Sequence, residues 1–233
     1  MNDALRTLSS FPSSSSTVYS GTSETVASEI LTNSGVQTAV VDWVLVELRS
    51  SPSTIVKSKA ALLLRNGDIV ATDGVSPVTF DVAQGSYHID IRHRNHLGVM
   101  TASPVTFSLP ATMTALVDFT LPSTMTYQGV SNPYPPQKSF TVGTTTVTAM
   151  YAGDANGDDT VRYNGNGSDR AAINSQLGST LPSTTTATKR GYFREDINMN
   201  GQVKLNGSNN DRIIILNMIG VSATTTTFIP QQF

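Results

Sequence analysis

The chain has 233 residues, of which 38% are hydrophobic and 14% are charged, and its formal net charge is −2. This length accommodates one large or two small domains, and the weak acidic charge offers no basic surface for a nucleic-acid partner. The absence of cysteine excludes disulfides, thiolate catalysis and cysteine-based zinc sites. No apolar run reaches the roughly 18 residues of a membrane span, so the sequence predicts no membrane insertion.

Residues 1–35 are rich in Ser and Thr and poor in large apolar side chains, which predicts a loosely ordered arm. Their start lacks the basic-then-apolar pattern of a signal peptide. The sequence alone therefore leaves three routes open: a removed signal, another mode of export, or retention inside the cell. The polar but weakly charged composition favours an extracellular or cell-surface location.

Residues 36–122 show the pattern of short β-strands. An apolar, β-branched run at 36–50 predicts a buried strand with Trp43 in the core, and Asn66-Gly67-Asp68 between two apolar runs predicts a hairpin turn. Further strands are expected at 104–109 and 113–121. Six or seven short strands at this spacing predict a β-sandwich.

The segment 87–92 alternates strictly. Its apolar members predict a buried face and its polar members a solvated face. The apolar residues are Tyr87, Ile89 and Ile91, and the polar residues are His88, Asp90 and Arg92. The prolines in "SNPYPPQKS" (131–139) then predict a linker or long loop over 123–142. The segment "TVGTTTVTAMYAGD" (141–154) predicts a strand that leads into a polar loop.

That polar loop occurs twice. "DANGDDTVRYNGNGSDRAAINSQLG" (154–178) aligns without gaps to "DINMNGQVKLNGSNNDRIIILNMIG" (196–220), with a constant offset of 196 − 154 = 42. Two copies at this period form a tandem pair rather than a solenoid. Segments 170–177 and 212–219 are expected to be short helices that end at Gly178 and Gly220.

The oxygen-bearing side chains of each loop have the spacing of a calcium site. Calcium binds six to eight oxygens, supplied by loop positions one, three and five, by the carbonyl of position seven and by a late carboxylate. The candidate ligands of the first loop are Asp154, Asn156, Asp158, the Thr160 carbonyl and Asp169; those of the second are Asp196, Asn198, Asn200, the Gln202 carbonyl and Asp211. Two calcium ions per chain are therefore expected.

This repeat resembles the duplicated calcium loop–helix of dockerin modules, and in particular the dockerin-like repeat of large Bacteroidetes haemagglutinin-like surface proteins. "RHRNHLGVMT" (92–101) and "RNGDIV…DGVSPVTFDV" (65–82) resemble segments of the same proteins, and "FDVAQGSYHIDIRH" (80–93) resembles the last hairpin of prealbumin-like or Cna-B-like sandwiches. The resemblance implies a mainly β protein with a small α part: a β-sandwich followed by a tandem EF-hand-like module. It also implies that Val161 and Val203 pair the two loops.

The repeat departs from the usual loop in two ways. The closing acids Asp169 and Asp211 are the sixteenth residues of their loops (169 − 154 + 1 = 16), whereas the usual closing acid is the twelfth. The usual sixth-position glycine is Asp159 in the first loop, although the second loop keeps Gly201. Because of the insertion, partner-contacting residues of dockerins cannot be transferred to this chain. The alternative for each loop is a polar turn in which Asp169 or Asp211 caps the following helix.

Other chemistry is less well supported. His88, His93 and His96 with Asp90 offer a conceivable transition-metal site, but hydrogen bonds to the backbone explain a histidine at a strand end equally well. No catalytic motif is present, so the chain is not expected to be an enzyme. The carboxylates available for a paired-acid hydrolase, predicted to lie on turns or wet strand faces, are Glu47, Asp68, Asp73, Asp81 and Asp90.

The sequence thus predicts a non-enzymatic, calcium-stabilised extracellular structural protein, a building block of a surface appendage, filament or adhesin. Its expected partners are further copies of itself or another surface protein, contacted through the arm and the end "TTTTFIPQQF" (224–233). The alternatives are a dockerin-type docking module and a polysaccharide-binding accessory domain. The expected organisation is an arm at 1–35, a β-sandwich at 36–122, a linker and strand at 123–148, the tandem module at 149–222 and a tail at 223–233.

Overall fold

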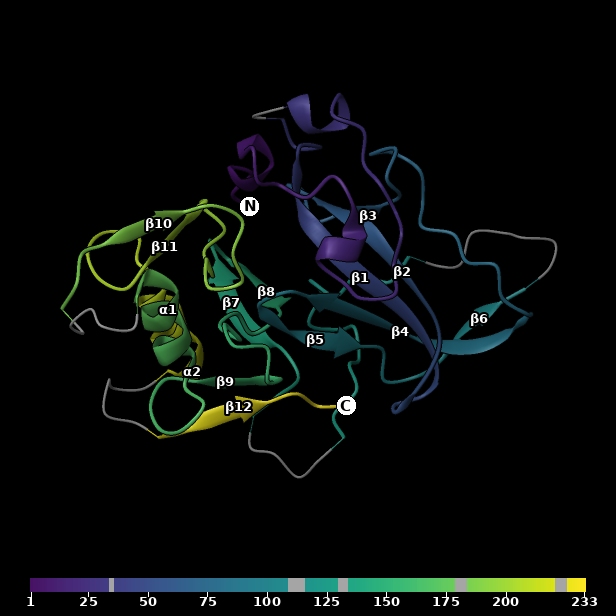
Figure 1. The fold of residues 1–233 in the computed structure, drawn as a ribbon. Helices are drawn as coiled ribbons and strands as arrows, with labels where there is room; N and C mark the ends of the chain where they lie inside the picture. Colours follow the sequence, from purple (N-terminus) through teal and green to yellow (C-terminus); the bar gives the residue numbers. More distant parts are fainter. Residues whose placement is uncertain (34–35, 109–115, 130–133, 179–183, 221–225) are drawn as a thin grey trace.

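The computed structural model describes residues 1–33, 36–108, 116–129, 134–178, 184–220 and 226–233. Within them the chain is mainly β, with antiparallel sheets and two α-helices, as the sequence predicts (Figure 1). Neither helix has the length and hydropathy of a membrane span in this part of the chain.

The largest sheet has six strands in the order β3-β2-β1-β4-β5, and β6 pairs with β4 off this path. The strands are β1 (Val40–Ser51), β2 (Thr54–Leu64), β3 (Ile69–Val70), β4 (Gly85–His93), β5 (His96–Met100) and β6 (Val105–Phe107). The predicted hairpin turn joins β2 to β3, with Gly67 at a φ of +101° that favours glycine. Of the strand predicted at 113–121, residues 113–115 lie outside the described residues, and 116–121 form turns and irregular backbone instead.

One face of this sheet is covered by the N-terminal segment. The prediction of a loose arm is wrong, because residues 1–33 form three 3-10 turns and bury Leu5 and Phe11 against Trp43. The Trp43 indole donates to the Pro12 carbonyl at 2.9 Å, which fixes the segment to β1. The few apolar side chains of this Ser-rich segment are therefore part of the core.

The other face is covered as well, so the fold is sandwich-like. Val44, Val46 and Ile91 pack there against Phe80, Phe119 and Met150 from irregular segments. This double cover makes the predicted wet face of 87–92 wrong: His88 is 8% exposed and Asp90 is 0% exposed. Buried partners satisfy these polar groups, since His88 bonds the Thr101 carbonyl and Asp90 pairs with Arg49 and Arg92.

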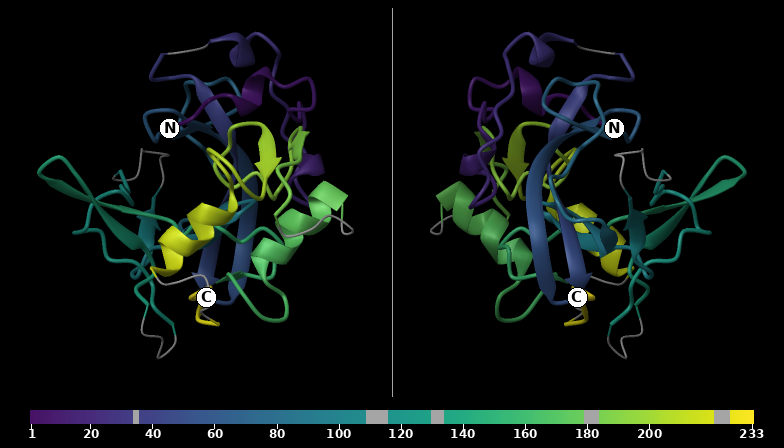
Figure 2. Two further views of the ribbon diagram at one scale, coloured as in Figure 1. Left: turned by 90° about the vertical axis from the view of Figure 1, so that its left-hand side faces the viewer. Right: turned by 90° about the vertical axis from the view of Figure 1, so that its right-hand side faces the viewer.

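The remaining elements form a second region of the molecule, on the left of Figure 1. Its three two-stranded sheets pair β7 (Lys138–Val142) with β8 (Thr145–Ala149), β9 (Thr160–Arg162) with β12 (Phe228–Pro230), and β10 (Thr188–Arg190) with β11 (Gln202–Lys204). The helices are α1 (Asp169–Gly178) and α2 (Arg212–Ile219), where the sequence predicts them. Two predictions here are wrong: the end of the expected linker forms β7, and 141–154 holds the turn and second strand of a hairpin followed by a loop rather than one strand. The β7–β8 ribbon projects from the body (Figure 2).

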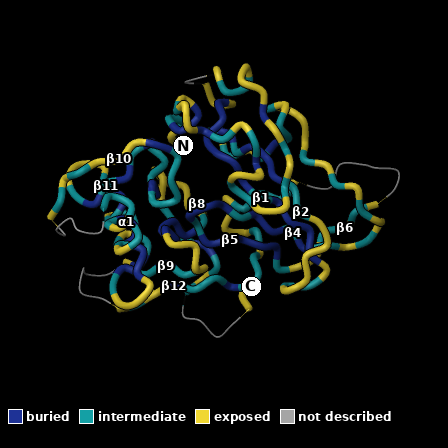
Figure 3. Tube along the Cα trace, viewed as in Figure 1, coloured by how far each residue is buried: buried dark blue, intermediate teal, exposed yellow. Residues whose placement is uncertain are grey.

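The turn between β4 and β5 joins the two regions. The Leu97 amide donates to the Tyr151 carbonyl, and the Gly153 amide donates to the Asn95 carbonyl, both at 2.9 Å. Leu97 belongs to the same apolar core as the repeated loops. A run of buried residues therefore continues from β4 and β5 into the start of the loops (Figure 3).

Candidate metal centres

The two loops have the same backbone course. Each runs from its first aspartate through a short strand, β9 or β11, to its helix, α1 or α2. Left-handed residues recur at matched positions: Gly157 and Met199 have φ values of 74° and 58°, and Asp159 and Gly201 have values of 60° and 82°. The repeat in sequence is thus also a repeat in conformation, and Asp159 adopts the backbone that the glycine adopts in the second loop.

The closing aspartates turn back onto their own loops. Asp169 Oδ1 accepts from the amides of Ala155 (2.7 Å) and Asn156 (3.3 Å), and Asp169 Oδ2 accepts from Arg162 (2.6 Å). Asp211 has the same three bonds 42 residues later, from Ile197 (2.8 Å), Asn198 (3.2 Å) and Lys204 (2.8 Å).

Helix capping does not explain these two side chains. Asp169 is already the first residue of α1, and Asp211 precedes α2 without a capping bond from its side chain. The Asn210 side chain takes that role instead by accepting from the Ile213 amide. The carboxylates of Asp169 and Asp211 face the loops.

The first half of each loop is also matched. Asp154 Oδ1 accepts from the Asp158 amide, and Asp196 Oδ1 accepts from the Asn200 amide, both at 3.1 Å. The side-chain amides of Asn156 and Asn198 donate across the loop to the backbone carbonyls of Gly167 (2.8 Å) and Asn209 (2.9 Å). These bonds bring the first, third and closing positions of each loop together.

The carbonyls predicted as ligands point away from the neighbouring strands. Gln231 donates to the Asp159 carbonyl, and Gly191 donates to the Gly201 carbonyl. Neighbouring residues in an antiparallel ladder alternate in direction. The carbonyls of Thr160 and Gln202, each one residue further along, are therefore not used in these ladders and are directed back to the loops.

Each loop buries two carboxylates beside one another. Burial raises the pKa of Asp154 and of Asp196 to about 6, and that of Asp169 and of Asp211 to about 7. The neighbouring aspartate adds to the rise at Asp169 and at Asp211, while the backbone amides counter it. Two carboxylates held together out of water are costly unless a cation or a proton neutralises them.

One further oxygen fits a cation. Asn200 Oδ1, at the predicted fifth position of the second loop, is buried and has no hydrogen-bond partner in the part of the chain that the structure describes. Its counterpart Asp158 is exposed and accepts from the Asn156 amide at 3.0 Å. Within the described residues, no group of three or more His, Cys, Asp or Glu side chains is arranged to hold a metal ion. The oxygens brought together thus combine two carboxylates per loop with amide and backbone groups.

The predicted pairing of the two loops through Val161 and Val203 is wrong. Val161 pairs with Ile229 of β12, and Val203 pairs with Lys189 of β10. Both valines are completely buried in one core that also holds Ile173 of α1 and Ile215 of α2. The two loops therefore contribute to one apolar core, but their strands do not pair with each other. In the tail, Ile229 and Gln232 are likewise buried, at 1% and 4% exposed.

Asn95 is a site residue that the ligand pattern does not reveal. It is fully buried, and its side-chain amide donates to the carbonyls of Arg194 (2.8 Å) and Asp196 (2.9 Å). Its own carbonyl accepts from Gly153, the residue before Asp154. One residue therefore holds the entry of both loops. The sequence signal for it is its place in the segment "RHRNHLGVMT" (92–101).

The histidines beside Asn95 serve as hydrogen-bonding groups. His93 Nε2 donates to Asp42 Oδ2 at 3.0 Å, and His93 Nδ1 lies 2.9 Å from His96 Nδ1. Burial would raise the pKa of the Asp42 carboxyl, but Arg94 and His93 outweigh it and hold that pKa well below its usual range. Burial, His93 and Arg94 lower the pKa of His96. The cluster is a neutralised network between the sheet and the loops.

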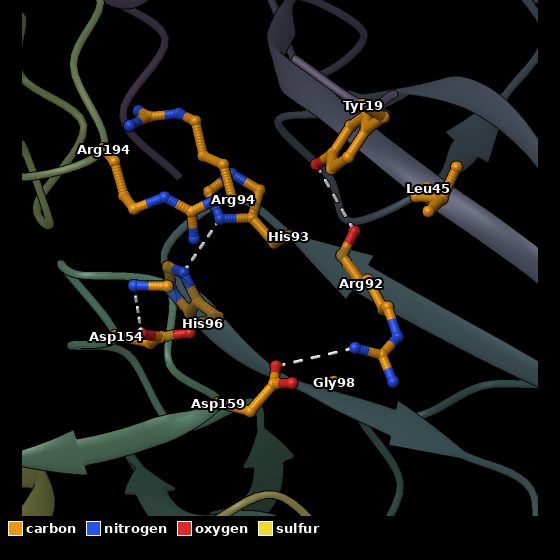
Figure 4. Close-up of a pocket in the computed structure, with 11 residues that line it drawn as sticks. Tyr19, Leu45, Arg92, His93, Arg94, His96, Gly98, Asp154, Asp159 and Arg194 are labelled. Carbon is orange, nitrogen blue, oxygen red and sulfur yellow. Dashed lines mark hydrogen bonds and ion pairs between the residues drawn. The ribbon is translucent and has the colours of Figure 1, made fainter. Parts of the chain in front are cut away.

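A cavity of about 150 Å³ lies between this network and the first loop. Figure 4 shows Arg94 and Arg194 on one side of it, and Arg92 with Asp159 on the other. Small-molecule sites usually measure roughly 300–1,000 Å³, so this cavity is small for a sugar or a substrate.

The carboxylates considered for hydrolysis are arranged differently from the prediction. Asp68, Asp73 and Asp81 are on loops and turns, but Glu47 and Asp90 are buried. Arg49 Nε lies 3.0 Å from Asp90 Oδ2, and Arg49 Nη2 lies 2.6 Å from Glu47 Oε2. The Phe233 ring covers Arg49 at 5.2 Å. These two acids are enclosed in an ion-pair cluster.

Comparison of the chain with protein-family models, with curated proteins and with solved structures finds no match.

Proposed function

We propose that each loop binds one calcium ion and that the two ions stabilise the fold. The observation that carries the proposal is the pair of buried carboxylates in each loop, Asp154 with Asp169 and Asp196 with Asp211. A hard divalent cation neutralises such a pair and accepts the amide and carbonyl oxygens around it. The buried Asn200 Oδ1, without a hydrogen-bond partner among the described residues, supports the same assignment.

The ligands would be those named from the sequence, with the late aspartates closing the shell. Their backbone hydrogen bonds leave lone pairs on the carboxylate oxygens, since an ionised carboxylate has about four acceptor positions. Asp158 is on the surface of the first loop and would turn from Asn156 towards the ion. The ion supplies positive charge at the loop, and the chain's own residues fix the loop ends.

Heat unfolding with calcium and with chelator tests this role. An ion that binds only the folded chain stabilises it by about 2.7 kcal/mol per site at a hundredfold excess over its Kd. Asp169→Asn and Asp211→Asn should each remove part of the calcium-dependent rise in Tm, whereas the exposed control Asp81→Asn should keep it. An unchanged Tm in all four proteins, with and without calcium, would overturn the proposal.

We further propose that the chain is an extracellular structural building block that associates with copies of itself. The packed arm, the neutralised acid cluster and the small cavity all favour a structural role over catalysis. Analytical ultracentrifugation and negative-stain imaging of the purified chain test it. Defined high-mass species from the chain alone support self-association. A monomer that associates only with a second surface protein supports docking, and retention on a glycan matrix supports polysaccharide binding.

A further inference from the structure

Among the described residues, one edge of the β7–β8 ribbon has no backbone partner. The ribbon is a two-stranded sheet that projects from the body of the molecule (Figure 2). Val142, next to its turn, is 64% exposed. An isolated two-stranded hairpin is marginal in water, and additional strands stabilise it.

The register shows which backbone groups this edge presents. Val142 pairs with Thr145 across a two-residue turn, so alternate pairs such as Phe140 with Val147 are hydrogen-bonded within the ribbon. Ser139 and Thr141 therefore direct their N–H and C=O groups outward from β7. On the opposite strand the same alternation directs Thr148 outward, and its amide indeed donates to the Thr120 carbonyl at 2.9 Å. No described residue bonds the outward backbone groups of Ser139 and Thr141.

This edge also lacks the usual protection against pairing. Free edges in native proteins carry lysines, prolines or bulges. The exposed edge of β2 has Lys57 and Lys59, and its pairing with β1 has register shifts near the tip. The one lysine of β7, Lys138, is at its first position and donates from Nζ to the Met218 carbonyl at 2.9 Å. From Ser139 to Ala149 the ribbon contains no charged residue and no proline, and its register is continuous.

We propose that β7 pairs antiparallel with β7 of a second copy of this chain, which gives a four-stranded sheet β8-β7-β7-β8. With Phe140 on the two-fold axis, Ser139 is opposite Thr141 of the other copy, and both pairs exchange two backbone hydrogen bonds. Lys138 is then opposite Val142 of the other copy, so the two lysines stay at opposite ends. The edge is thus complementary to itself in hydrogen bonding and in charge.

This pairing assigns a surface to the self-association proposed above, and the inference rests on that proposal. Proline removes one amide hydrogen and is tolerated at an edge where that hydrogen points outward. Thr141→Pro removes an amide from the open edge. Thr146→Pro is the matched control, because Thr146 is the cross-strand neighbour of Thr141 and points outward on the other edge.

Sedimentation of the full chain over a concentration series measures the dimer Kd, and a cooperative heat-unfolding transition shows that each variant is folded. The dimer Kd should rise at least tenfold in Thr141→Pro and change less than about twofold in Thr146→Pro. If the native chain associates but both variants associate equally well, the edge pairing is wrong and self-association stands. If the native chain remains a monomer at all concentrations, both proposals fail.

Discussion

Asn95 donates a hydrogen bond from its side-chain amide to the backbone carbonyl of Asp196, with a length of 2.9 Å. Through its own carbonyl it also holds Gly153, which precedes Asp154. The strands β9 and β11 of the two loops do not pair with each other, since β9 pairs with β12 and β11 with β10. We therefore expect Asn95 to position the first ligand of both loops.

Replacing Asn95 should weaken both calcium sites together. Asn95→Ala removes the donor from the buried Asp196 carbonyl and from the partly buried Arg194 carbonyl. A buried group left unsatisfied costs about 1–3 kcal/mol. Calcium titration of this variant should show a lower affinity at both sites, and heat unfolding should show a lower Tm. Asn66, an exposed residue whose side chain bonds only within its own turn, is the control for affinity, since Asn66→Ala should leave binding at both sites unchanged. Loss of affinity at one site alone would contradict the coupling.

The two loops should differ in affinity. The first has three acidic candidate ligands, Asp154, Asp158 and Asp169, and the second has two, Asp196 and Asp211. Charge count raises affinity in such sites. Stepwise chelation should empty the second loop first, so Asp169→Asn should remove the tighter site and Asp211→Asn the weaker one. The reverse order would show that the greater burial of the second loop outweighs charge.

Stability without calcium should fall as the pH rises. In the unfolded chain these carboxyls lose their protons near the ordinary pKa of 3.8, but in the folded chain burial raises the pKa of Asp169 and Asp211 to about 7. The folded state therefore holds more protons between pH 4 and pH 7, and its stability declines across that window. With chelator, Tm should be lower at pH 8 than at pH 5. Calcium should remove this difference, because it replaces the lost protons.

Two left-handed glycines of the second loop, Gly201 and Gly207, test how much the backbone conformation contributes to stability. Gly201 has a φ of +82°, and a Cβ there would lie 3.2 Å from the Leu8 side chain. Gly201→Ala should destabilise the protein by about 1–2 kcal/mol from the backbone alone, and by more if Leu8 does not move. Gly207→Ala is the control, because its φ is +88° but its Cβ would meet nothing within 4 Å. Equal Tm values for both variants would assign the whole cost to the backbone.

The packed N-terminal segment predicts a large effect of a small change. Leu5 is fully buried against the sheet. Leu5→Ala should therefore lower the free energy of unfolding by about 2–5 kcal/mol, as in other cores. Urea unfolding measures it, and Leu121→Ala, at a residue 48% exposed, is the control. A change below about 0.5 kcal/mol at Leu5 would show that the segment is loose after all.

The sequence predicts local elements well, but it predicts poorly which distant segments bury each face of the sheet. The turn at Asn66-Gly67 and the helices after Asp169 and Asp211 depend on nearby residues and occur where predicted. The burial of Asp90 and His88 depends on segments distant in the chain that cover both faces of the sheet, and period-two alternation does not distinguish a wet face from a buried ion-pair network. The partners of Val161 and Val203 are also set by distant strands, and a repeat alone predicts that they meet each other.

The most direct test of the calcium assignment is isothermal titration calorimetry of the chelator-stripped full chain with CaCl₂ at pH 7.5. Two binding events per chain are predicted in the native protein, and the double variant Asp169→Asn/Asp211→Asn should show none while the Asp81→Asn control keeps both. Absence of binding to the native chain at millimolar calcium would contradict the assignment, and the repeated loops would then be polar turns stabilised by their backbone hydrogen bonds alone.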